Sequence, residues 1–371
     1  MRRTSSPRSS PTDARGGHAP SRTRIRTPPR QARPGAAPRH DPHHAPRAIP
    51  IASVIHLTSR ETGTMKHRNL TILAAAAAVV VGLTGCGTPG SASGGGVDAG
   101  TNAPENGDGP YKLELTENPT FDEGTTMARL AAAGEMKVGT KYDQPLFGLA
   151  GLDGKPAGFD VAIAALVASK MGIPFDSIKF TETVSANREP FIQNGSVDAV
   201  VATYTINDKR KEVVDFAGPY YVAGQALMVL ADDTTINTPE DVRGKQVCSV
   251  AGSTPAANIE ATFGAVVVPT DVYSKCLDPL RNGQVSAVTT DNVILSGFID
   301  QNEGEFKLVG DGETFTQEPY GIGIAKDDEA FRTFINDTLQ EAYDDGTWAR
   351  LFEATAGTVI DTPEPPAIDR Y

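Results

Sequence analysis

The feature that most constrains the fold is a regular alternation of short β-branched runs with stretches whose apolar residues recur at helical spacing. In the first half of this pattern we expect strand, helix, strand, helix and strand at 136–140, 159–171, 177–181, 188–194 and 197–201. Strands separated by helices pair in parallel, so this order predicts an α/β fold built on a parallel sheet.

The alternation returns in the second half of the chain. We expect helices that begin at 239 and cover 255–263 and 276–282, with strands at 246–251, 266–268 and 285–289. The two halves are joined near 221–225 and again near 317–321, which predicts two lobes with two crossings. Ligands of such sheets bind beyond the carboxyl ends of the strands. We therefore expect a site between the lobes.

Charge divides the chain into two kinds of sequence. Residues 1–64 contain twelve Arg, no Lys and three acidic residues, a sum of +9, whereas the whole chain carries −12. This segment lacks periodic apolar positions, so we expect it to be disordered or to lie upstream of the true start at Met65. A basic arm for nucleic acid is the alternative.

Residues 65–85 have the features of a secretory signal. A positively charged start precedes an apolar run over 70–83, which is too short for a ~30 Å hydrocarbon core that needs about 20 residues. Leu83-Thr84-Gly85-Cys86 resembles a bacterial lipobox, in which the Cys receives a lipid and becomes the new N-terminus. Gly and Ser dominate directly afterwards, so we expect 86–124 to be a flexible linker behind a lipid anchor at Cys86.

The residues from 111 to 356 form an acidic globular part, because the chain after residue 64 sums to −21. An acidic surface argues against nucleic acid as a partner. No His follows His67, which argues against Ser-His or Cys-His catalysis and against a metal centre, and we expect no cofactor. In an exported protein Cys248 and Cys276 favour a disulfide, with two free thiols as the alternative.

Eight short segments occur in the order found in one family of binding proteins. They are Gly139–Pro145, Ser185–Arg188, Gln193–Asp198, Ala202–Asn207 with Arg210, Val214–Tyr220, Cys248–Pro255, Thr289–Asp291 and Tyr320–Gly323. Through them the chain resembles the type II periplasmic-binding-protein family in its polar amino acid branch, above all the glutamate-binding lipoproteins of ABC importers in high-GC Gram-positive bacteria.

The resemblance covers residues 125–355 and implies two lobes that close on one amino acid without chemistry. It implies a first lobe from 125–221 with 321–356, a second lobe from 222–320 and a C-terminal tail at 357–371.

For the α-carboxylate of the ligand, the resemblance indicates Arg210, whose planar guanidinium suits bidentate pairing. A solvated surface Arg between Lys209 and Lys211 is the alternative. Ser253 and Thr254 are expected at a helix start, with Thr254 as its cap, where free backbone N–H groups would hold the same carboxylate. A plain N-cap is the other interpretation.

For the ammonium group, the resemblance indicates Asp291, which follows an expected strand. Thr203 and Thr205 would share this task through carbonyl and hydroxyl groups. A turn or cap role is the alternative for Asp291.

For the ligand side chain, Lys141 and Arg188 supply two further cations, which suit a second carboxylate. A solvated Lys141 and an ion pair of Arg188 with Glu189 or Glu182 are the alternatives. Tyr273 and Tyr320 either line the cleft or pack in the core.

Taken together, these features predict a monomeric binding protein, not an enzyme, on the extracellular face of the cell membrane. It would bind glutamate, or else aspartate, glutamine or asparagine, and deliver it to an ABC permease and its ATPase. A lyase of the cyclohexadienyl dehydratase type and an amino-acid-sensing module are the alternatives on the same fold.

Overall fold

The computed structural model describes residues 107–371. The interpretations of residues 1–64, of the signal at 65–85 and of Cys86 therefore lie outside the described residues. Across 107–371 no helix combines the length and the apolar character that crossing a bilayer requires.

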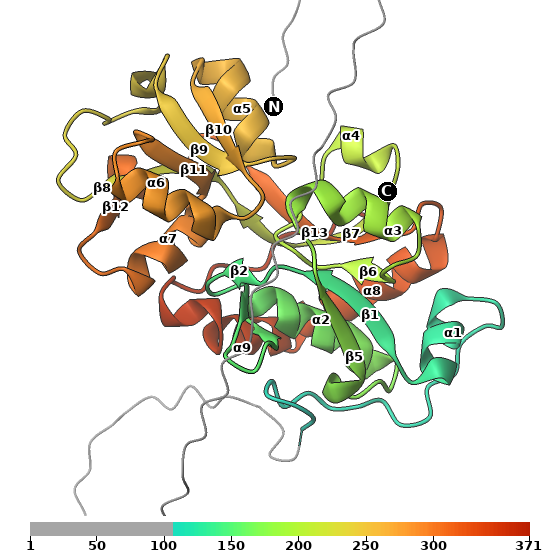
Figure 1. Cartoon of the computed structure of the whole chain (residues 1–371). Coiled ribbons are helices and arrows are strands. Elements are labelled where there is room, and N and C mark those ends of the chain that lie inside the picture. The colour runs from blue at the N-terminus through green and yellow to red at the C-terminus, as the bar shows by residue number, and fades with distance from the viewer. Residues whose placement is uncertain (1–106) are drawn as a thin grey trace, which may run out of the picture. The chain divides into compact units, whose positions relative to one another are not determined.

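The first lobe is built on a five-stranded sheet in the order β5-β1-β6-β13-β7 (Figure 1). Strand β1 pairs in parallel with β5 and β6, whereas β13 runs antiparallel to β6 and β7. The strands are β1 (Met136–Thr140), β5 (Ile178–Glu182), β6 (Ala199–Val200), β7 (Asp215–Ala223) and β13 (Glu318–Ile324). The helices of this lobe are α1 (Thr126–Ala133), α2 (Phe159–Lys170), α3 (Arg188–Gln193), α4 (Asp208–Lys211), α8 (Glu329–Asp344) and α9 (Thr347–Glu353).

The second lobe repeats this plan with a sheet in the order β10-β9-β11-β8-β12. Strand β9 is parallel to β10 and β11, and β8 is antiparallel to β11 and β12. The strands are β8 (Gln225–Leu230), β9 (Gln246–Val250), β10 (Val266–Thr270), β11 (Ala287–Asp291) and β12 (Phe306–Leu308). The helices are α5 (Thr254–Phe263), α6 (Leu277–Arg281) and α7 (Asn292–Gln301).

The chain passes twice between the two sheets. It leaves the first sheet at the end of β7, enters the second at β8, and returns from β12 to β13. A small antiparallel sheet of β2 (Asp143–Gln144), β3 (Gly148–Ala150) and β4 (Pro156–Ala157) is added beside the first lobe. The predicted two-lobed α/β fold with two crossings is confirmed.

Most predicted elements are present within one or two residues, and the strand at 136–140 has the predicted bounds. The strand predicted at 285–289 lies instead at 287–291, because its last residues pair with β8 up to Asp291 opposite Gln225. The helix predicted to begin at Pro239 is a single 3-10 turn that ends at Val242.

Helix α2 contributes its buried residues to the hydrophobic core of the first lobe. Apart from Asp160 and Ser169 its residues from Phe159 to Ser169 are apolar, and all of them are buried. The Phe159 ring packs against Phe352 and Trp348 of α9, with ring centroids 5.0 and 5.6 Å apart. Such a helix is stable only when it is covered on all sides, as it is here.

Residues 107–124, which the sequence assigns to the linker, pack on this lobe. Tyr111 and Leu113 are buried in the core. The Tyr111 hydroxyl accepts a hydrogen bond from the backbone N–H of Gly158 at 3.2 Å. The described end of the expected linker therefore belongs to the folded part of the chain.

The predicted disulfide between Cys248 and Cys276 is present. It joins β9 to the end of the 3-10 segment Tyr273–Cys276, and both residues are buried. A bond that closes a loop of 28 residues restricts the unfolded chain and so stabilises the folded one.

We expect that replacing both cysteines by Ala lowers the free energy of unfolding by about 3–4 kcal/mol, because the loop-closure entropy of the unfolded chain is restored. Urea denaturation followed by circular dichroism measures this difference. A dithiothreitol-treated wild-type chain should lose the same amount, and an unchanged denaturation midpoint in both samples would contradict the prediction.

Candidate ligand-binding site

Three cationic side chains of the first lobe are buried close together. Lys141 follows β1, Arg188 begins α3 and Arg210 lies in α4; their exposed fractions are 3%, 2% and 7%. The guanidinium carbons of Arg188 and Arg210 lie 4.3 and 5.0 Å from the centroid of the same Tyr204 ring. Buried cations of this kind are rare unless they are paired or have a function.

Arg188 is held by backbone carbonyls and not by a carboxylate. Its Nη1 donates to the carbonyls of Ala202 and Thr203 at 3.1 and 3.2 Å, and its Nε donates to that of Ser185 at 3.3 Å. Burial and the neighbouring Arg210 lower the pKa of Arg188 to about 10. Among the described residues no ion pair joins Arg188 to an acid, so the alternative of a pair with Glu189 or Glu182 is wrong.

Lys141 is buried, so the alternative of a solvated Lys is also wrong. Its Nζ donates to the Ser185 hydroxyl at 3.0 Å. Burial and the Arg188 charge lower the pKa of Lys141 to about 7, against the opposing effect of Asp143 and Asp160. An anionic ligand beside this ammonium would raise its pKa again.

Arg210 connects the two lobes. Its Nη1 donates to the Thr205 carbonyl at 2.6 Å, and its Nη2 donates to the carbonyl of Gly252 in the second lobe at 3.2 Å. Its Nε lies 3.3 Å from a carboxylate oxygen of Glu189. Arg has five N–H donors, so two remain for a ligand. The alternative of a solvated Arg is wrong, since Arg210 is buried, whereas Lys209 beside it is exposed.

In the second lobe, the start of α5 faces this cluster. The N-cap is Ser253, whose hydroxyl accepts from Ala256 N at 3.1 Å, so the prediction of Thr254 as the cap is wrong. Thr254 is the first helical residue, and its hydroxyl donates to Glu318 at 2.9 Å. Ser253, Thr254 and Arg210 line one groove of about 640 Å³ between the lobes.

Asp291 ends β11 and lies buried on the second-lobe side of the site. Its Oδ2 accepts a hydrogen bond from the Tyr320 hydroxyl, whereas its Oδ1 has no partner among the described residues. Burial and the Glu318 carboxylate raise the pKa of Asp291 to about 7. Asp291 occupies the N-cap position of α7, as the alternative of a cap residue has it, but its side chain makes no capping hydrogen bond to that helix.

Thr203 and Thr205 lie on the loop after β6, and both are buried. Each carbonyl already accepts from a guanidinium, that of Arg188 or that of Arg210. Thr203 has a φ of 43°, an unusual value for a β-branched residue, and its N–H donates to Asp160 at 2.8 Å. The hydroxyls of Thr205 and of Thr254 in the other lobe lie within hydrogen-bond distance, 3.2 Å apart.

Sequence reasoning missed several polar residues of the site. Beside Asp291 Oδ1, four buried polar atoms lack a partner among the described residues: Thr140 Oγ1, Gln144 Nε2, Tyr204 Oη and Thr290 Oγ1. Gln144 and Thr290 stand inside segments that carried the family resemblance, so the signal was present without a role attached to it. Such atoms cost free energy unless a ligand or water satisfies them.

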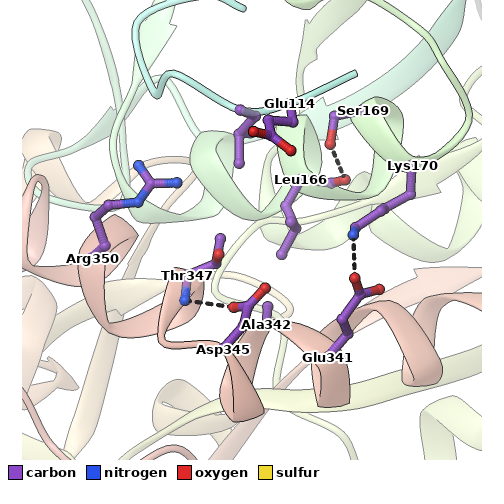
Figure 2. A pocket seen from close by; sticks show the side chains of 10 residues that line it. Glu114, Leu166, Ser169, Lys170, Glu341, Ala342, Asp345, Thr347 and Arg350 are labelled. Carbon is purple, nitrogen blue, oxygen red and sulfur yellow. Dashed lines mark hydrogen bonds and ion pairs between the residues drawn. The ribbon is translucent and has the colours of Figure 1, made fainter. Parts of the chain in front are cut away.

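A separate hollow of about 250 Å³ lies on the first lobe among α2, α8 and α9 (Figure 2). Lys170 there pairs with Glu341 at 2.7 Å, and Asp345 accepts from Thr347 N at 2.8 Å. Its polar groups are thus largely satisfied by one another. None of the unpartnered buried atoms belongs to the lining of this hollow or of the groove between the lobes. The groove is the better candidate because it holds three of the predicted residues, Arg210, Ser253 and Thr254, whereas the hollow holds none; Lys141, Arg188 and Asp291 are buried outside the groove lining.

Comparison with known proteins agrees with this geometry. The chain matches the family described as bacterial extracellular solute-binding proteins, family 3, over residues 136–357. It is 42% identical over 254 residues to the glutamate-binding protein GluB of Corynebacterium efficiens, covering 66% of this chain and 86% of the relative. It is 36% identical over 230 residues to the glutamine-binding protein GlnH of Bacillus subtilis, covering 62% and 83%.

Solved structures show the same fold. An ancestral arginine-binding protein bound to glutamine is 36% identical, with a TM-score of 0.56, and the match covers 59% of this chain and 96% of that one. The family match spans more than half of the chain. The chain therefore belongs to the bacterial extracellular solute-binding proteins of family 3.

Proposed function

We propose that the chain is the substrate receptor of an ABC importer and binds L-glutamate between its lobes. The observation that carries this proposal is the buried cluster of Lys141, Arg188 and Arg210 in the first lobe, together with the buried Asp291 of the second lobe, whose Oδ1 has no partner among the described residues. Asp291 lies near enough to Arg188 and Arg210 for both charges to lower the pKa of its carboxyl. A dicarboxylic amino acid offers two anionic groups for the cations and one ammonium group for the acid.

Each end of the ligand has a matching set of groups. The two free N–H donors of Arg210 and the N-terminus of α5 would bind the α-carboxylate. Asp291 would accept the ammonium. Arg188 and Lys141 would bind the side-chain carboxylate, with the Gln144 amide N–H as a further donor. The names of the relatives, glutamate- and glutamine-binding proteins, support an α-amino acid of this size.

Closure of the lobes would couple binding to transport. The contacts of Arg210 with Gly252 and of Thr254 with Thr205 join the two lobes, and a ligand that touches both lobes favours this closed arrangement. The permease would then recognise the closed form. No step in this role makes or breaks a covalent bond.

The cellular setting belongs to the same proposal. The signal at 65–85 and a lipid on Cys86 would hold a monomeric receptor on the extracellular face of the membrane, next to the permease and its ATPase. Mass spectrometry of the mature chain tests this part, since a first residue other than a lipidated Cys86 would exclude it.

Titration calorimetry of the full chain with each of the twenty amino acids tests the ligand. We expect glutamate to bind most tightly. A chain that binds no amino acid, or that prefers a cationic one, would overturn the proposal.

We expect Arg210→Ala to weaken glutamate binding more than about a hundredfold, because a buried ligand carboxylate left without its partner costs about 3–5 kcal/mol. Calorimetry measures the dissociation constant. Arg243→Ala is the matched control, since Arg243 is exposed and lies outside the groove lining, so its loss should leave the affinity nearly unchanged. Equal affinities in the two variants would remove Arg210 from the site.

We expect Arg188→Met to separate stability from function. Without ligand, the free energy of unfolding of the variant should change little, because the removal of a buried charge without a carboxylate partner offsets the loss of the donor to the carbonyls of Ser185, Ala202 and Thr203. Glutamate affinity should fall about a hundredfold, and glutamine affinity much less. Urea denaturation and calorimetry measure the two effects. A variant that loses stability and keeps its affinity would show that Arg188 is structural only.

We expect glutamate affinity to be greatest near pH 7. As the pH falls below about 7, Asp291 takes up a proton and no longer attracts the ammonium. As the pH rises above about 7, Lys141 loses its proton and no longer attracts the side-chain carboxylate. Calorimetry from pH 5 to 9 follows both limbs. Lys141→Met should abolish the alkaline limb, and an unaltered pH profile in this variant would contradict the assignment.

A further inference from the structure

The C-terminal residues Asp361–Tyr371, here called the C-terminal strap, reach the one-turn helix that carries Arg210. Asp369 Oδ2 lies 3.1 Å from Nζ of Lys211, the residue that follows Arg210 in α4. The same Nζ lies 3.7 Å from the centroid of the Tyr371 ring. Arg332 of α8 contacts that ring as well, at 4.3 Å. The strap thus ties α4 to α8.

The strap also covers part of the edge of the first sheet. Strand β7 is the last strand of that sheet, so its outer N–H and C=O groups have no strand to pair with. Asp369 N donates to the Gly218 carbonyl at 2.8 Å, and the Tyr371 hydroxyl accepts from Phe216 N at 2.9 Å. These bonds fix the place of the strap beside α4, which leads directly into β7.

Helix α4 depends on such outside contacts. It spans only Asp208–Lys211, and isolated helices shorter than about 12 residues are marginal in water. Its start is capped by Asn207, whose side chain accepts from Arg210 N at 2.9 Å. At its end, the Lys211 carbonyl accepts from Lys326, while the Lys211 side chain goes to the strap. These contacts fix the backbone of the single turn from which the Arg210 side chain projects.

We propose that the C-terminal strap is a positioning element for the ligand site, which holds Arg210 in place through Lys211. The inference rests on the proposed function, because it concerns the residue assigned to the ligand carboxylate. The family match ends at residue 357, so the strap lies beyond the matched region.

A chain that lacks residues 369–371 tests the role of the strap. We expect its dissociation constant for glutamate to rise about three- to tenfold, as the loss of the two contacts that reach α4, the Lys211–Asp369 ion pair and the Lys211–Tyr371 cation–π contact, implies. Arg370→Ala is the matched control. Arg370 pairs with Asp337 of α8, not with α4, so its removal should change the affinity by less than about twofold.

The same truncation made in a Lys211→Ala chain distinguishes a positioning role of the strap from a general loss of stability. In a Lys211→Ala chain, removal of residues 369–371 should weaken binding no further, because the contact that transmits the effect is already gone. Should the shortened chain fail to fold by thermal melting, Tyr371→Ala in the full chain replaces it, with an expected loss of about threefold.

The outcomes distinguish the two proposals. Full and shortened chains that bind glutamate equally well overturn the strap and leave the proposed function standing. The strap is likewise overturned if the shortening costs as much in the Lys211→Ala chain as in the wild type. A full chain that binds no amino acid overturns both proposals.

Discussion

The burial of Arg188 without a carboxylate partner is the constraint on which the rest of the site depends. Taking a guanidinium out of water is costly, and the described residues offset that cost with three carbonyls and the face of Tyr204. Arg188 Nη1 donates to the carbonyls of both Ala202 and Thr203, so these two successive carbonyls must point toward the same side of the chain. The chain meets this demand by placing Thr203 at a φ of 43°, a strained value for a β-branched residue. The Asp160 carboxylate stabilises this strained conformation by accepting a hydrogen bond from the Thr203 N–H.

Strand β13, which follows the second crossing, contacts both lobes. Its residues Glu318 and Tyr320 belong to the first sheet, yet they contact Thr254 and Asp291 of the second lobe. Both contacts therefore depend on the relative position of the lobes. Thr254 and Asp291 are also the second-lobe residues assigned to the ligand. Their hydrogen-bonding groups would therefore take part both in ligand binding and in the contact between the lobes. A ligand that satisfies Asp291 Oδ1 while Tyr320 holds Oδ2 fits without breaking this link.

The sequence predicted the fold better than the site. Periodicity and strand–helix alternation are local signals, and they located β1, α2 and α5 almost to the residue. The disulfide followed from two cysteines in an exported chain. The cap of α5 was misplaced by one residue, because Ser253 and Thr254 are equally good capping residues and only the backbone geometry decides between them.

Which side chains of the site pair with one another could not be predicted from the sequence, since this depends on distances between segments far apart in the chain. Glu189 pairs with Arg210 and not with its neighbour Arg188. The buried amide N–H of Gln144 has no partner among the described residues, whereas its carbonyl oxygen accepts from the Thr203 hydroxyl. The resemblance named the positions of Lys141 and Arg188. It gave no sign that both are buried, which is what excludes a solvated surface role for them.

Local charge, not fold, is what would select the ligand. Structures of this fold include an arginine-binding protein solved with arginine and also with glutamine, so the architecture by itself accepts different side chains. In the proposed site, an arginine ligand would bring a third cation beside Lys141 and Arg188 where little water screens the repulsion. A glutamate side chain instead neutralises part of that charge and relieves the mutual repulsion of the two residues. In the proposed site the same pair would thus attract an anionic side chain and reject a cationic one, which is how a site can achieve specificity in a shared fold.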